Sequence, residues 1–145
     1  MKYVLILITS FTMLKGCSQE TTAENPLMIR YEASSRGYFY SVSVDPNSIM
    51  INNDRGGSGR LEKATTKNEW EELLVILKEI SLENLDDMDT PTEKRAADRA
   101  AMATLEIKYP RKSYISNTFD HGNPPATVRT LVDKLLQMAE TVERQ

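Results

Sequence analysis

The stretch TKNEWEELLVILKEI, residues 66–80, carries the clearest structural pattern in the chain. Its apolar side chains recur three or four residues apart, which places them on one face of an α-helix. Thr66 and Glu69 stand at its start with the spacing of a capping box, in which the two side chains bond each other's backbone amides. The pattern predicts a helix over 66–80 whose buried face consists of Trp70, Leu73, Leu74, Leu77 and Ile80.

Short strands are predicted before this helix. Tyr38, Tyr40, Val42 and Val44 alternate with other residues at the period of two that a half-buried strand requires. Pro, Gly, Asn and Asp stand between the strand-like runs, where they favour turns. The predicted segments are strands over 28–33, 38–44, 49–51 and 60–64, a hairpin connection at 34–37, a turn at 45–48 and a mobile loop over 52–59.

Residues 81–99 show no clear periodicity and hold an acidic cluster, so we expect a surface connection with a helical turn near 92–97. Alternating residues then predict two antiparallel strands, over 104–109 and 114–119. A closing helix is predicted to begin at Asn123 as N-cap, with two prolines in its first turn. Its expected apolar face consists of Val128, Leu131, Val132, Leu135, Leu136, Ala139 and Val142.

The order of these elements predicts the fold class. Strands, helix, strands and helix follow one another without regular strand-helix-strand alternation, which is typical of an α+β protein. Two amphipathic helices need a sheet to cover. We therefore expect residues 27–145 to form a single α+β domain, an antiparallel sheet of about five to six strands with both helices packed on one face.

Composition excludes several classes of function. The 145 residues carry a net charge of −3, so nothing favours the counterion release that drives nucleic-acid binding. One Cys excludes an intramolecular disulfide, and with one His it excludes a Cys/His zinc site within one chain. We predict no nucleic-acid partner, no metal and no cofactor.

The N-terminus has the layout of a secretory signal. A short positive start precedes an apolar stretch over 3–14, which as a helix would span only about 18 Å against roughly 30 Å for a bilayer core. Leu14-Lys15-Gly16-Cys17 resembles the lipobox of bacterial lipoproteins, although a small uncharged residue is usual where Lys15 stands. The alternative is an ordinary secretory signal with an unrelated cysteine.

The lipobox resemblance implies removal of a signal peptide over 1–16 and attachment of acyl chains, such as palmitate, to Cys17. Residues 17–26 are polar and aperiodic, as a flexible tether between membrane and domain should be. Several acyl chains together give a stable anchor. We therefore expect a membrane-anchored lipoprotein of the bacterial cell envelope, facing the periplasm or the cell surface.

Chemistry-bearing candidates are few. His121, the only histidine, follows Asp120 and precedes a predicted helix start, where backbone amides can hold an anion. The structural alternative is a turn in which Asp120 or His121 caps backbone groups. Ser34 and Ser35 supply hydroxyls, but a nucleophilic serine needs a base and an orienting acid close in space.

Three further segments favour structure over chemistry. The glycine-rich run 55–60 lacks the Gly-Lys-Ser/Thr ending and the helix that a P-loop requires. The acids in 83–89 lack the spacing of an EF-hand. Asp98 is expected to pair with Arg95, Arg99 or Arg36 as a structural contact.

The motif Ser35-Arg36-Gly37-Tyr38, the Trp70 helix, Asp98 and the motif FDHGNPP over 119–125 together resemble a group of small uncharacterised lipoproteins of Gram-negative bacteria. The resemblance covers most of 27–140 and implies localisation and fold more than activity. A fainter likeness in element order is to small bacterial protease-inhibitor domains, which is analogy alone.

Two hypotheses about function follow. The first is a lipid-anchored, non-catalytic binding module with a protein partner in the envelope. Its candidate binding residues are Ser35, Arg36, Asp98, Asp120 and His121. The alternative is a small envelope hydrolase that uses His121 with Asp120 or with a hydroxyl of Ser34 or Ser35. Their separation in space discriminates the two, since a base must reach its nucleophile at about 3 Å.

Overall fold

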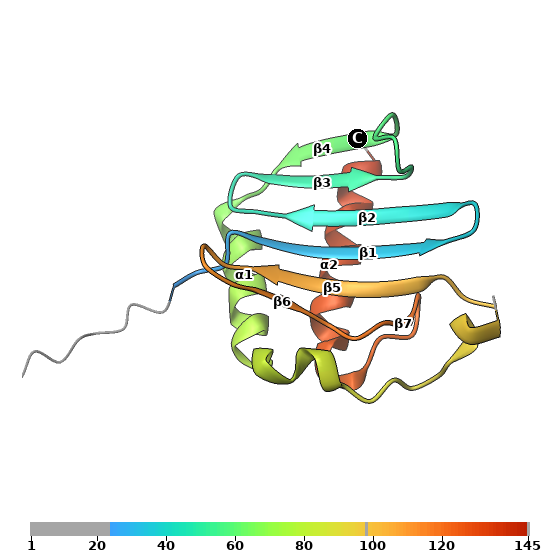
Figure 1. Cartoon of the computed structure of the whole chain (residues 1–145). Coiled ribbons are helices and arrows are strands. Elements are labelled where there is room, and N and C mark those ends of the chain that lie inside the picture. The colour runs from blue at the N-terminus through green and yellow to red at the C-terminus, as the bar shows by residue number, and fades with distance from the viewer. Residues whose placement is uncertain (1–23, 98, 145) are drawn as a thin grey trace, which may run out of the picture.

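The computed structural model describes residues 24–97 and 99–144. They form an antiparallel sheet with two α-helices behind one of its faces (Figure 1). The predicted α+β class, with both helices on one face, is confirmed. The predicted signal peptide, Cys17, most of the predicted tether and Asp98 lie outside the described residues.

The sheet follows the strand order β4-β3-β2-β1-β5-β6, and the short β7 also pairs with β5. All of these pairings are antiparallel. The first four strands are therefore a meander, and the chain returns to the other side of β1 only after the first helix. The strands are β1 (Met28–Ser35), β2 (Tyr38–Val44), β3 (Ser48–Asn52), β4 (Arg60–Ala64), β5 (Met102–Lys108), β6 (Ser113–Ile115) and β7 (Phe119–Asp120).

Alternation along the strands decides which side chains enter the core. Ile29, Tyr31 and Ala33 of β1 are fully buried on the helix side, while the residues between them are partly exposed. Val42 lies opposite Tyr31 and shares its face. Gly37 adopts φ +84° in the turn between β1 and β2, a conformation that favours glycine. The predicted strand period and hairpin are confirmed here.

Helix α1 (Lys67–Lys78) begins with the predicted capping box. The Thr66 hydroxyl accepts the Glu69 backbone amide at 3.2 Å, and the Glu69 carboxylate accepts the Thr66 amide at 2.8 Å. The helix ends before Ile80, so its predicted C-terminus was two residues too long. Trp70, Leu73 and Leu77 are buried, whereas Leu74 and Ile80 only pack against the edge of the core.

The acidic composition predicted a surface connection after α1, but part of this segment is buried. It forms two 3₁₀ helices, η1 (Leu82–Asp87) and η2 (Lys94–Ala97), and the second matches the predicted turn near 92–97. Leu85 in η1 is 1% exposed and belongs to the core. Leu82 and Met88 also pack against the core, and Asn117 donates hydrogen bonds to the carbonyls of Leu85 and Met88, so several contacts together hold this segment.

The prediction of one strand over 114–119 was wrong, because the chain leaves the ladder after β6. The Ser116 hydroxyl accepts the backbone amide of Leu105 at 2.9 Å, in place of a regular strand partner. Asn117 then turns toward η1 and donates its backbone amide to the carbonyl of Leu85 at 3.0 Å. Pairing with β5 resumes only at β7.

Helix α2 (Ala126–Glu143) starts later than predicted, with Pro125 rather than Asn123 at the N-cap. A residue before proline is pushed out of the helical region, so Pro124 cannot open the helix, and Pro125 itself is extended with ψ 146°. Its buried face includes Met138 where Leu136 was expected, and Leu136 is only partly buried. No helix within the described ranges is long and apolar enough to cross a bilayer.

Candidate functional site

The motif over 119–125 lies at one end of the sheet, beside the β1–β2 hairpin and η2 (Figure 1). β7 holds it there by pairing with β5, and the His121 backbone amide donates to the carbonyl of Ala101 at 2.9 Å. Two segments far apart in sequence, the hairpin and this motif, are thus brought together. The chain enters the sheet at the opposite end, where Leu27 donates to the carbonyl of Lys108.

His121 is held by two tyrosines. The hydroxyl of Tyr31 lies 2.6 Å from Nδ1, and that of Tyr38 lies 3.2 Å from Nε2. A neutral imidazole has one donor and one acceptor nitrogen, so the two hydroxyls satisfy both. Burial lowers the pKa of His121, which favours this neutral form. The imidazole is therefore part of the packing at the sheet end.

The carboxylate of Asp120 holds η2 and does not bond the His121 ring. Its carboxylate accepts the backbone amides of Lys94 at 2.8 Å and Arg95 at 2.9 Å, together with the Thr92 hydroxyl. The Arg95 guanidinium adds an ion pair at 3.3 Å. Burial opposes ionisation of this carboxyl, but the hydrogen bonds outweigh it and lower the pKa of Asp120 to about 2. Asp120 therefore caps backbone amides of η2, whereas the predicted cap lay in the turn before the closing helix, which has no side-chain cap.

The tyrosines around His121 remain protonated at neutral pH. Burial, followed by the charge of Glu143, raises the pKa of Tyr38, and the same causes raise the pKa of Tyr40 to about 12. Burial also raises the pKa of Tyr31. The hydroxyls of Tyr31 and Tyr38 act as hydrogen-bond partners of His121 and not as activated nucleophiles.

The serines of the hairpin do not join His121. Within the described ranges, no hydrogen bond or ion pair links its ring to Ser34, Ser35 or Asp120. Ser34 lies three residues from Tyr31 on the same strand and therefore faces the other side of the sheet. The Ser35 carbonyl accepts the Arg55 guanidinium at 3.3 Å, and Arg36 is exposed in the turn.

The remaining sequence candidates also serve structure. In the 52–59 loop the Asp54 carboxylate accepts the Gly59 amide at 2.6 Å and the Ser58 hydroxyl at 2.7 Å, so these groups are already occupied. In the acidic cluster, Glu83 pairs with Lys112 at 3.0 Å.

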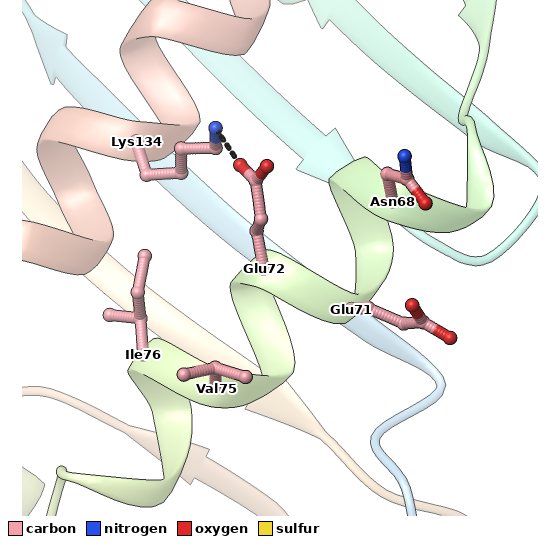
Figure 2. Close-up of a pocket in the computed structure, with 6 residues that line it drawn as sticks. All are labelled: Asn68, Glu71, Glu72, Val75, Ile76 and Lys134. Carbon is pink, nitrogen blue, oxygen red and sulfur yellow. Dashed lines mark hydrogen bonds and ion pairs between the residues drawn. The ribbon is translucent and has the colours of Figure 1, made fainter.

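A second candidate lies on the outer side of the helix layer, where α1 and α2 enclose a shallow groove of about 570 Å³. Figure 2 shows Glu72 of α1 and Lys134 of α2 pointing toward each other, with an ion pair between them. Val75 and Ile76 follow one turn further along α1. Val75 is 62% exposed, which leaves an apolar surface uncovered in the middle of a charged helix.

The groove continues beyond this pocket. Adjoining hollows of about 230 and 440 Å³ share Ile76 with it and add residues of α2. The sequence prediction missed this site, because it assigned apolar residues of 66–80 only to the buried face. A signal was present: five consecutive apolar residues, 73–77, exceed what one helix face can bury.

Comparison of the chain with protein families, with curated proteins and with solved structures finds no match.

Proposed function

We propose that this protein is a lipid-anchored, non-catalytic binding module of the bacterial cell envelope. The observation that carries the proposal is the apolar groove between α1 and α2, with the exposed side chain of Val75 among its lining residues. Exposed apolar surface with a polar rim is typical of protein-binding sites. The partner is therefore a protein of the same compartment, and the groove is the surface that contacts it.

The hydrogen bonds that His121 and Asp120 make support a binding function over a hydrolytic one. Both ring nitrogens lie against tyrosine hydroxyls, and the neighbouring carboxylate of Asp120 holds the η2 segment. A hydrolase would need the imidazole to contact its nucleophile and an acid to orient it. The motif over 119–125 instead ties three parts of the chain together.

The anchor rests on Leu14-Lys15-Gly16-Cys17 and the polar residues after it. Acyl chains on Cys17 would hold the domain by the sheet end at which β1 begins, opposite the β1–β2 hairpin (Figure 1). The groove is formed by the two helices, whereas Cys17 precedes β1 in the chain. We therefore assign anchoring and binding to different parts of the protein.

The size of the protein in detergent-solubilised envelopes tests the proposal. Wild type should migrate in a complex larger than itself on native gels, and Val75→Glu should migrate as the free protein. Leu61→Glu is the matched control, since Leu61 is also an exposed apolar residue but lies on β4, outside the groove. Migration of wild type as the free protein, or equal effects of the two variants, would contradict the proposal.

A hydrolase screen tests the alternative directly. Purified protein should not cleave ester, peptide or glycan substrates, and His121→Asn should keep the native-gel complex. If wild type instead shows activity, and the folded His121→Asn variant loses about 10²-fold or more of it, His121 is a catalytic base and the non-catalytic proposal is wrong.

A further inference from the structure

We infer that the groove between α1 and α2 binds a basic amphipathic helix of another envelope protein. The inference rests on the proposed binding function and names the chemistry of the partner. Three features of the groove carry it: an apolar floor, walls made of helices, and an excess of carboxylates.

The apolar floor runs along α1. Val75 is the most exposed residue of the strip, and Ile76 and Ile80 are partly buried below it. Leu131 of α2 lies beneath the end near Ile80 but is itself fully buried, so the accessible strip belongs to α1. A helix of 12 residues is about 18 Å long at about 1.5 Å per residue, so the strip suits roughly three turns of a partner helix.

The two helices that form the walls of the groove favour a helical partner over an extended peptide. The backbone amides and carbonyls of α1 and α2 are bonded within their own helices and offer no partners to another chain. An extended peptide in the groove would leave its backbone groups on this side unpaired, whereas a helix satisfies its own. Apolar side chains three and four residues apart on such a helix would cover Val75 and Ile76.

The charges around the floor select a basic partner. Four carboxylates line the groove and its continuations, against one lysine, Lys134. Lys134 is already paired with Glu72, and Lys67 lies 3.6 Å from Glu71 at an exposed position. The other two carboxylates come from different helices: Glu79 stands at the end of α1 and Asp133 lies on α2. A second copy of this groove would place carboxylates against carboxylates, so the charge disfavours self-association and favours Lys or Arg.

Photocrosslinking in cells from position 75 tests the inference. The full chain carries a photoreactive phenylalanine in place of Val75, and mass spectrometry identifies the crosslinked segment. A second sample carries the same group in place of Arg36, exposed in the β1–β2 turn at the far end of the sheet. We expect position 75 to capture a segment of another protein with apolar residues at helical spacing and a net positive charge.

Each of the other crosslinking results contradicts a different part of the inference. Capture of an acidic, neutral or extended segment overturns the partner chemistry and leaves the binding function standing. Capture of residues 1–16 of this chain, or of a second copy, overturns the choice of occupant. Crosslinks from position 36 alone show that the partner binds elsewhere, and no crosslink from either position contradicts the binding function as well.

Charge reversal gives a second readout on the same crosslink. The pair Glu79→Lys and Asp133→Lys should lower the yield from position 75 by about tenfold, equivalent to about 1.4 kcal/mol of lost attraction. The matched control is Asp86→Lys with Asp87→Lys, two exposed acids of η1 with the same change in charge. Equal yields from the two double variants, both folded by circular dichroism, would overturn the basic character of the partner.

Discussion

Tyr31 is one of the two tyrosines that contact the His121 ring. It is fully buried in the central strand β1, and its hydroxyl lies against Nδ1 at 2.6 Å. The tyrosine and the histidine are 90 positions apart in sequence, and no local pattern links them. Sequence analysis could identify His121 as a candidate, but the partners of its ring follow only from strand register. The same holds for Asp120 and Thr92, which are joined by tertiary packing.

Removing the Tyr31 hydroxyl should therefore lower the free energy of unfolding. Tyr31→Phe leaves a half-buried ring nitrogen without its partner, and we expect a loss of about 1–3 kcal/mol in the free energy of unfolding. Tyr38→Phe should lose less than about 1 kcal/mol, because Tyr38 is exposed and water can replace its hydroxyl. Urea denaturation measures both variants. A larger loss for Tyr38→Phe would contradict the assigned geometry.

The lowered pKa of His121 predicts a pH dependence of stability. In the unfolded chain the imidazole titrates near its ordinary value of 6.5, and in the folded protein it titrates lower. Below pH 6.5 the unfolded state therefore binds a proton that the folded state does not, so stability falls as pH falls.

Urea denaturation at pH 7.5 and 5.5 checks this dependence. Wild type should lose stability at the lower pH, and His121→Asn should lose less, because asparagine does not titrate. An identical decrease in the two proteins would show that groups other than His121 cause it.

At the scale of single elements, α1 shows why some predictions succeeded. Its capping box and its buried Trp70, Leu73 and Leu77 are local signals, fixed by spacing within one helix. The start of α2 and the break between β6 and β7 depend instead on which of two competing backbone arrangements is the more stable. Two adjacent prolines delay the helix, and Ser116 and Asn117 find partners outside the strand ladder.

The two faces of α1 should differ in their effect on stability. Leu73 is fully buried, so Leu73→Ala should cost about 2–5 kcal/mol of unfolding free energy. Val75 lies on the outer face, and Val75→Ala should change stability by about 0.5 kcal/mol or less. Thermal or urea denaturation compares the two. Similar losses would mean that Val75 is packed inside the protein, which would remove the groove.

At the scale of the whole molecule, the fold separates three regions. β1 begins at one end of the sheet, and the β1–β2 hairpin lies at the opposite end (Figure 1). The Tyr31–His121–Tyr38 cluster forms beside that hairpin, and the outer surface of the helices forms the groove. Sequence periodicity predicted the α+β class because each helix and most strands carry their own pattern. The apolar run 73–77 could have indicated an exposed apolar side chain, but the groove itself depends on how α1 and α2 pack against each other.

We propose that this protein binds its partner at a membrane to which acyl chains on Cys17 attach it. Metabolic labelling with a fatty acid, followed by membrane fractionation, tests it most directly. Wild type should carry the label and sediment with membranes, and Cys17→Ser should carry none and remain unprocessed. Equal labelling of the two proteins, or unlabelled wild type in the soluble fraction, would contradict the lipid anchor.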